Sequence, residues 1–189
     1  KYCPEEDIRR IVGDNPTPLK ISIMADAGKC DYREDIPKKE SSIVDLIRVA
    51  CYLHQIPLAL DMVQDAHDKG YETTINLMAV TTAEERELDA GLEMLASSEA
   101  GVIYLVDSFG ALTPRHTVHL ARKYLNYAAF GGKEVGMHAH NNLLLAFSNT
   151  VEAASLGVNY LDATMAGLGR GAGNCPMELL LGFLDNTRY

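Results

Sequence analysis

The sequence predicts an α/β protein built on a parallel sheet, and three observations support this prediction. Short apolar segments rich in β-branched residues recur along the chain, with helical segments between them. Most are nearly continuous apolar runs rather than alternating ones, which is typical of parallel strands covered by helices. The segments begin roughly 30 residues apart, the length of a strand–helix unit in which successive strands run parallel.

Two architectures fit this pattern of strands. The segments predicted as strands are residues 19–26, 43–50, 72–80, 101–108, 134–140 and 159–167. They could form either a doubly wound open sheet or a (β/α)8 barrel, and both place function at the carboxyl ends of the strands. A complete barrel has eight strands, two more than we predict. No composition shift or low-complexity tract divides residues 1–189, so we expect a single domain.

Helices are predicted between the strands. The segments expected to be helical are residues 55–69, 82–97, 113–127, 142–156 and 174–185. The first ends before Gly70, a residue that commonly stops a helix. The third opens with Thr113 as N-cap and Pro114 at the first helical position. Residues 26–42 are polar, and either an irregular loop or a degenerate helix fits them.

The composition narrows the class of function. The formal net charge is -9, which argues against a general nucleic-acid binder because such proteins usually present a basic face. No apolar run approaches the ~18–20 residues of a membrane span, and the opening KYCPEEDIRR lacks the apolar region of a signal peptide. The scattered cysteines Cys3, Cys30, Cys51 and Cys175 are expected to be free thiols. These features favour a cytoplasmic protein.

The stretch VGMHAHNN carries two histidines at the end of a predicted strand. Side chains at positions i and i+2 of a strand point to the same face, so His138 and His140 share one face. Val135, Met137 and Ala139 form the other face and are expected to pack against helices. Imidazole binds divalent first-row ions, so the pair indicates a metal site. Two hydrogen-bonded histidines at a barrel mouth fit the pattern about as well.

The glycine-rich turn AGLGRGAGNCP follows the last predicted strand. Glycines allow tight turns and a close approach of the backbone to a ligand, so Gly169 and Gly171 are candidate substrate-binding positions. The helix expected beyond the turn offers free N–H groups to an anion. Asn174 either caps that helix or directs its carbonyl oxygen to a metal, and the cap is the commoner role for such a residue.

Polar residues also occur in or just after four other predicted strands. They are Arg48, Asn76, Asp107, Ser108 and Asp162. A charge within an apolar strand is costly unless it is paired or used. Residues from separate strands would form a ring around a barrel mouth, so these five are candidate substrate-binding residues. A structural ion pair of Arg48 with Asp107 or Asp162 is the alternative.

Taken together, VDSFGALTP, VGMHAHNN and AGLGRGAGNCPMELL resemble one family of enzymes. They are similar to the pyruvate-forming aldolases of the HMG-CoA lyase-like metal-dependent TIM-barrel superfamily, with the 4-hydroxy-2-oxovalerate aldolases as the nearest branch. The resemblance covers residues 43–185. It implies that the six predicted strands are the third to eighth of a (β/α)8 TIM barrel, and that this chain is part of a longer protein.

The resemblance also implies a metal site and a reaction. A divalent ion, Mn²⁺ or Mg²⁺, would be bound by His138 and His140, and by Asn174 as in the lyase branch. The family's aspartate ligand and neighbouring arginine belong to an Arg-Asp-Gly motif that this sequence lacks, and its general base follows that motif. Catalytic residues therefore stay unassigned. The implied reaction cleaves a 4-hydroxy-2-oxo acid to pyruvate and an aldehyde through a metal-stabilised enolate, with Arg48 sharing in carboxylate binding.

Two alternative functions remain open at this point. An acyl-CoA Claisen lyase or synthase of the HMG-CoA lyase or isopropylmalate synthase type would carry a similar histidine strand. A non-catalytic barrel fragment would explain the missing aspartate. The expected partners are a small-molecule 2-oxo acid and further copies in a homo-oligomer, with neither nucleic acid nor membrane. An aldehyde dehydrogenase partner fits the resemblance, but its docking region is absent from this sequence.

Overall fold

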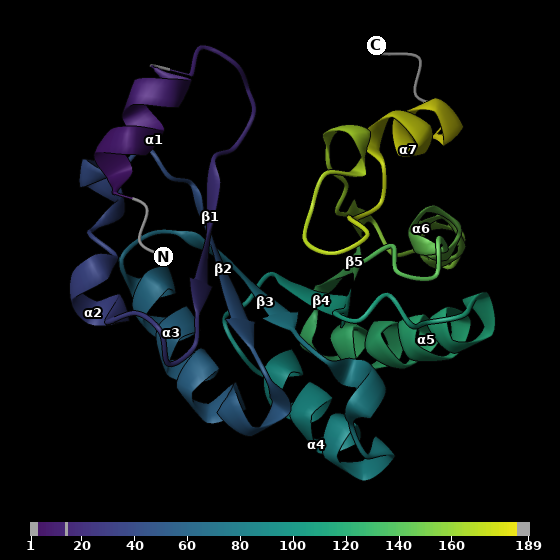
Figure 1. Ribbon diagram of the computed structural model, residues 1–189. Coiled ribbons are helices and arrows are strands. Elements are labelled where there is room, and N and C mark those ends of the chain that lie inside the picture. Colours follow the sequence, from purple (N-terminus) through teal and green to yellow (C-terminus); the bar gives the residue numbers. More distant parts are fainter. Residues whose placement is uncertain (1–3, 14, 185–189) are drawn as a thin grey trace.

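The computed structural model describes residues 4–13 and 15–184, and its centre is one curved sheet of six parallel strands (Figure 1). These are β1 (Ser22–Asp26), β2 (Leu46–Cys51), β3 (Glu72–Leu77), β4 (Val102–Asp107), β5 (Glu134–Ala139) and β6 (Tyr160–Leu161). The strands are neighbours in chain order from β1 to β6. A doubly wound sheet reverses its order at a switch point, whereas this sheet continues in one direction, as a (β/α)8 barrel does. The barrel prediction is confirmed.

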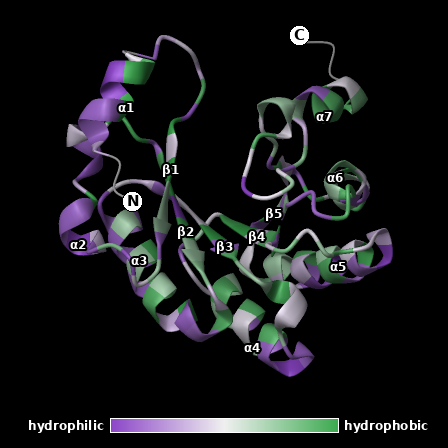
Figure 2. Cartoon of the chain, viewed as in Figure 1, coloured by the Kyte–Doolittle hydropathy of each residue, from purple (hydrophilic) through white to green (hydrophobic). Residues whose placement is uncertain are grey.

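Helices α3 (Ile56–Asp68), α4 (Glu85–Ala96), α5 (Pro114–Gly131) and α6 (Ala146–Ser155) line the outer side of the sheet (Figure 1). The shorter helices α1 (Glu5–Val12) and α2 (Tyr32–Asp35) lie near the β1 end of the sheet, and α7 (Met177–Phe183) lies beside α6. Helices α3, α4 and α5 confirm the predictions for residues 55–69, 82–97 and 113–127. Figure 2 shows apolar strands, with apolar and polar residues alternating along the helices, as expected of helices that cover a sheet on one side.

The two faces of the sheet contribute to two separate cores. Helix-facing residues of every central strand join the main core, and they include Ile47, Ile75, Leu105, Val135, Met137 and Ala139. The alternate residues Val102, Tyr104 and Val106 form a smaller cluster on the inner face, with Met78 packed against it. The predicted packing of residues 135, 137 and 139 against helices is therefore confirmed, and the inner face is free to carry polar side chains.

The chain leaves the sheet earlier than predicted at its last strand. The strand expected at residues 159–167 pairs with β5 only through Tyr160 and Leu161. Beyond it, Thr164 forms an isolated bridge with Pro176, and Ala166 has a positive φ of 51°. The final helix begins at Met177 rather than at residue 174, and its expected end at residue 185 lies outside the described residues.

Two regions gain short helices. Residues 26–42, which fit either a loop or a helix by sequence, contain α2 and a 3-10 turn at Lys39–Ser41. Helix α1 was not predicted; it carries polar and charged residues on most of its surface, and none of its side chains is fully buried. Within the described part of the chain, no helix is long and apolar enough to cross a membrane. The described cysteines Cys30, Cys51 and Cys175 are free thiols, as predicted.

Candidate metal centre at the carboxyl ends of the strands

The two histidines of strand β5 lie side by side at its carboxyl end. His138 is on the inner face of the strand, and His140 follows directly after the last strand residue. Their ring centroids are 5.1 Å apart and the rings meet edge to face at 81°. Both side chains are partly exposed. The predicted placement on one face is confirmed, and both imidazoles are within reach of a common ligand.

Asn174 lies next to this pair through its backbone. It forms an isolated antiparallel bridge with His140, and Asn141 N–H donates to the Gly173 carbonyl at 2.9 Å. The side-chain Nδ2 donates to the Leu168 carbonyl at 3.1 Å, whereas the buried Oδ1 has no hydrogen-bond partner. The alternative role as a helix cap is wrong, because α7 begins three residues later and has no side-chain cap.

Arg48 and Asp162 form the ion pair that was the alternative to substrate binding. Arg48 Nη1 donates to Asp162 Oδ1 at 3.0 Å, and Nη2 donates to Oδ2 at 2.6 Å. The two side chains are only 16% and 18% exposed. Asp162 Oδ2 also lies 2.9 Å from His138 Nδ1. The carboxylate therefore joins the arginine of β2 to the first histidine of β5.

Tyr104 is a component of this site that the sequence did not reveal. The Arg48 guanidinium carbon lies 4.4 Å from the centre of its ring, a cation–π distance. Gly136 is opposite Tyr104 in the register of β4 and β5, and a Cβ there would lie 2.4 Å from the tyrosine Cε1. A glycine inside an apolar strand signals such a close approach. Asn76 completes the layer by accepting from Arg48 Nε at 3.4 Å.

The electrostatics of the site follow from burial and pairing. Burial alone would raise the pKa of the Asp162 carboxyl, but hydrogen bonds from His138 and Arg48 outweigh it and hold that pKa below its usual value. Burial, followed by the charge of His138, lowers the pKa of His140. Burial raises the pKa of Tyr104 to about 12, so its phenol stays neutral at physiological pH. Neutral imidazoles are the form that binds metals.

Asp107 and Ser108 are used by the backbone around them. Asp107 is fully buried, and its two carboxylate oxygens accept from the N–H groups of Ala111 and Leu112 at 3.0 and 3.1 Å. Ser108 Oγ accepts from Ala79 N–H at 2.9 Å. These contacts favour a structural role for Asp107 over the expected substrate contact, because no face of its carboxylate is open.

The glycine turn closes on itself. Asn174 N–H donates to the Gly167 carbonyl at 2.9 Å. Gly169 packs against the Asn174 side chain, since a Cβ at Gly169 would lie 2.4 Å from Asn174 Nδ2. Gly171 has a positive φ of 65° and its backbone is exposed. Substrate contacts by Gly169 and Gly171 stay predictions, as does the anion site expected at the start of the last helix, which begins at Met177.

The residues present fit part of a metal centre. Among residues 4–13 and 15–184 there is no group of three His, Cys, Asp or Glu side chains arranged to hold an ion. Two imidazoles nevertheless lie side by side at the strand ends, and Asn174, whose buried Oδ1 has no partner, is bridged to His140 through its backbone. Nitrogen and neutral oxygen donors suit divalent first-row ions such as Mn²⁺. His138, His140 and Asn174 could therefore hold such an ion together with a further ligand.

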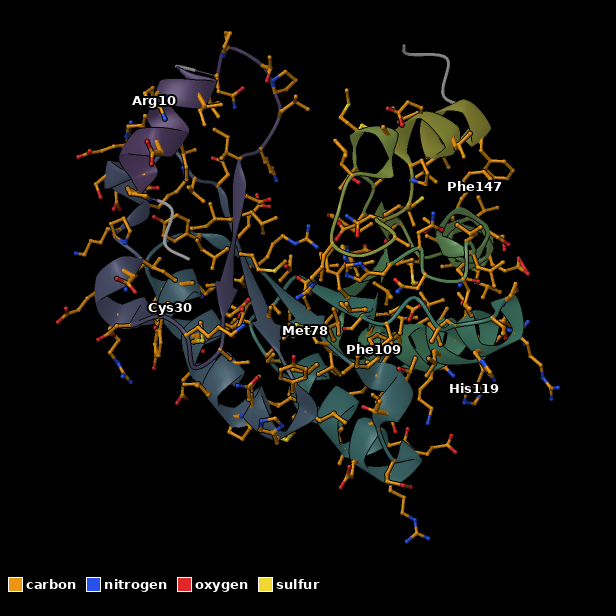
Figure 3. All side chains as sticks on the ribbon, viewed as in Figure 1. Arg10, Cys30, Met78, Phe109, His119 and Phe147 are labelled. Atoms are coloured by element: carbon orange, nitrogen blue, oxygen red, sulfur yellow. The ribbon has the colours of Figure 1, made fainter. Side chains whose placement is uncertain are left out.

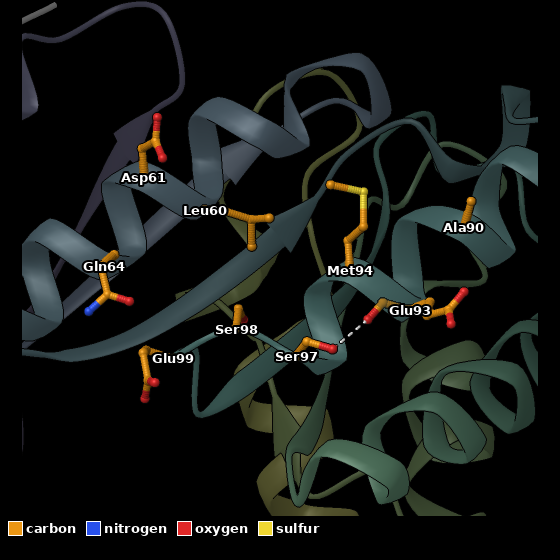
Figure 4. Close-up of a pocket in the computed structure, with 9 residues that line it drawn as sticks. All are labelled: Leu60, Asp61, Gln64, Ala90, Glu93, Met94, Ser97, Ser98 and Glu99. Atoms are coloured by element: carbon orange, nitrogen blue, oxygen red, sulfur yellow. Dashed lines mark hydrogen bonds between the residues drawn. The ribbon is translucent and has the colours of Figure 1, made fainter.

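Figure 3 shows how densely side chains fill the region between the strand ends and the glycine turn. A separate surface pocket lies away from this region, between α3 and α4 (Figure 4). It is lined by residues that include Leu60, Asp61, Glu93 and Met94. The segment before β4 also borders this pocket, which places the pocket toward the amino ends of the strands. Barrel enzymes carry their active sites at the opposite, carboxyl end.

The fold and the site define a barrel protein with a candidate metal centre at the carboxyl ends of its strands. Comparison with known proteins agrees: the chain belongs to the HMGL-like family, whose model matches residues 53–188. The resemblance to the HMG-CoA lyase-like superfamily is thereby confirmed.

Individual relatives give more detail. The chain is 35% identical over 148 residues to an oxaloacetate decarboxylase from Mycobacterium tuberculosis, covering 77% of this chain and 43% of that protein. It is 32% identical over 183 residues to a 4-hydroxy-2-oxovalerate aldolase from Thermus thermophilus, covering 97% and 52% respectively. The crystal structure of the HMG-CoA lyase from Bacillus subtilis matches with a TM-score of 0.76 at 17% identity, covering 90% of this chain and 64% of that one. The chain thus spans about half the length of the curated relatives it matches.

Proposed function

We propose that this chain is the metal-binding part of a carbon–carbon lyase that cleaves a 4-hydroxy-2-oxo acid, such as 4-hydroxy-2-oxovalerate, to pyruvate and an aldehyde. The observation that carries the proposal is the pair of adjacent imidazoles, His138 and His140, at the strand ends, with Asn174 bridged to His140 through its backbone. The relatives named 4-hydroxy-2-oxovalerate aldolase support the reaction. The proposed cofactor is Mn²⁺ or Mg²⁺, and imidazole ligation favours Mn²⁺.

The proposed roles follow from the contacts of each group. His138, His140 and Asn174 would hold the ion, which supplies Lewis-acid chemistry to the 2-oxo group of the substrate. The His140 ring hydrogen bonds to the Gly173 backbone, which restrains its orientation. Tyr104 presents a neutral phenol beneath the site. No described residue is placed to act as the general base, and we assign none.

The test combines metal binding with product formation. Mn²⁺ affinity would be measured by calorimetry, and pyruvate release from 4-hydroxy-2-oxovalerate by NADH oxidation with lactate dehydrogenase. His138→Ala and His140→Ala should each lower Mn²⁺ affinity by more than tenfold, since each removes a ligand. His119→Ala is the matched control, because His119 is exposed on α5 and should leave affinity unchanged. Absence of Mn²⁺ binding by the wild-type protein would refute the metal site.

Oxaloacetate decarboxylation is the second candidate, favoured by the 35% identical relative of that name. Oxaloacetate and 4-hydroxy-2-oxovalerate are both 2-oxo acids whose carbon–carbon cleavage leaves pyruvate, so one site chemistry serves both. Substrate choice separates them, since the same coupled assay can be run with either acid. Release of free CoA from an acyl-CoA would instead select the Claisen alternative, and metal binding without turnover of any of these substrates would favour the non-catalytic fragment.

A further inference from the structure

We propose that Asp162 is a positioning residue for His138, and that Arg48 holds Asp162 in that role. This inference rests on the metal site proposed above and deepens it, because it names the residues that orient one of its ligands. It replaces the expectation that Arg48 and Asp162 contact substrate directly.

The position of Asp162 is fixed by the sheet itself. Asp162 directly follows β6, and its backbone N–H donates to the Met137 carbonyl at 2.9 Å. Met137 is the neighbour of His138 in β5, so this bond sets the aspartate beside the histidine. The carboxylate then reaches His138 Nδ1 at 2.9 Å. Both backbone and side chain therefore tie Asp162 to the strand that carries the metal ligands.

The contact decides which histidine nitrogen is available. A carboxylate accepts the Nδ1 proton of a neutral imidazole, so Nε2 keeps the free lone pair that a metal requires. Metal-binding histidines usually donate their second N–H to such a carboxylate, which fixes the orientation of the ring. The geometry thus assigns Nε2 of His138 as the ligand atom.

Arg48 restrains the carboxylate from the other side. Its two terminal nitrogens donate to both oxygens of Asp162, a bidentate geometry that defines the orientation of the carboxylate plane. The guanidinium is itself held by Asn76 Oδ1 and by the Tyr104 ring. With both oxygens engaged, Asp162 is better placed to orient a ligand than to be one, in keeping with the lack of a three-residue acid and histidine cluster among the described residues.

The test uses the variant Arg48→Met with Asp162→Leu, which removes both charges and leaves neither partner unpaired. Replacing a buried ion pair by apolar residues of similar size is often tolerated, so the protein should fold. We expect its Mn²⁺ affinity to fall about 10–100-fold. Arg48→Lys keeps the charge but not the planar fork and should give a smaller loss. The matched control is Lys69→Met with Asp65→Leu, a similarly shielded pair at the C-terminal end of α3, which should leave affinity unchanged.

A second readout needs no metal. Long-range ¹H–¹⁵N correlation spectra of the metal-free wild-type protein should show His138 with its proton on Nδ1, and the double variant should lose this preference. Wild-type His138 protonated on Nε2, or unchanged Mn²⁺ affinity in the folded double variant, would overturn the inference. If the wild-type protein binds no Mn²⁺, the proposed function fails, and the spectra still decide whether Asp162 orients His138.

Discussion

The close packing beneath the site requires that residue 136 has no side chain, and Gly136 meets this requirement. The Tyr104 ring lies between the guanidinium of Arg48 and the backbone of β5, and a Cβ at residue 136 would come within 2.4 to 2.7 Å of three of its ring atoms. The ring cannot swing away without losing its contact with Arg48. This glycine is therefore required for space and not for an unusual backbone conformation.

We predict that Gly136→Ala destabilises the protein by about 1–3 kcal/mol, the usual cost of overpacking a filled interior. Urea unfolding followed by circular dichroism measures this loss. Adding Tyr104→Leu should recover part of it, because the smaller side chain leaves room for the new methyl group, and a double-mutant cycle would report the coupling. Gly182→Ala is the control, since a Cβ there meets nothing within 4 Å. Equal stabilities for Gly136→Ala and the wild type would contradict the steric argument.

At the scale of elements, Asp107 connects the end of β4 to the loop before α5. Its carboxylate accepts two backbone hydrogen bonds, a partly buried one from Ala111 and a buried one from Leu112, whose N–H group would otherwise be a buried donor without a partner. This explains why an acid can be fully buried in an otherwise apolar strand. Asp107 is also the last residue of β4 in register with β5, where its backbone is paired with Ala139.

Asp107→Ala should lower the free energy of unfolding by about 2–4 kcal/mol, because it leaves the buried Leu112 N–H and the partly buried Ala111 N–H unpaired. Asp107→Asn keeps one acceptor oxygen and should cost less. Thermal and urea unfolding measure both, with Asp61→Ala on the exposed surface of α3 as a control expected to stay within about 0.5 kcal/mol of wild type. A loss below that threshold for Asp107→Ala would return Asp107 to the list of candidate substrate contacts.

Local sequence patterns correctly predicted the elements whose structure depends mainly on their own residues. Apolar runs located β2 to β5, and the period of two placed His138 and His140 on one face. The end of β6 was missed, because it depends on bridges formed with residues far along the chain, such as Thr164 with Pro176. Asn174 is a residue type that often caps helices, but here it bridges to His140 and α7 begins three residues later. Such pairings depend on strand register, which no local pattern contains.

The same limit applies to the contacts within the site. The sequence offered two partners for Arg48, and only the register of the sheet selects Asp162 over Asp107. The contact between Asp162 and His138 joins residues 24 positions apart. Tyr104 had no polar or catalytic signal, although the glycine opposite it was a sign of a bulky neighbour. Contacts across strands were therefore the part of the site that required the structure.

At the scale of the whole molecule, the sheet has two edges. Strands β3 and β4 have a neighbour on each side, whereas β1 pairs only with β2 and β6 only with β5 among the described residues. Met24 on β1 is 54% exposed although it lies in register with Arg48 of the site. An edge strand presents unpaired backbone groups and is a template for pairing with another chain. Exchange of the backbone amides at these edges can therefore report whether another chain pairs with the sheet in solution.

Hydrogen exchange should follow this architecture. We predict that amides of β1 exchange much faster than those of β3 and β4, because a strand with one neighbour leaves about half of its N–H groups without an acceptor in the sheet. Mass spectrometry of peptic fragments at two protein concentrations measures the difference, with the β3 peptide as internal reference. Protection of β1 that rises with concentration would indicate that a second copy covers the edge, as in the homo-oligomer named among the expected partners. Protection of β1 equal to that of β3 at every concentration would contradict the prediction, since an open strand cannot retain its outward-facing amide protons that long.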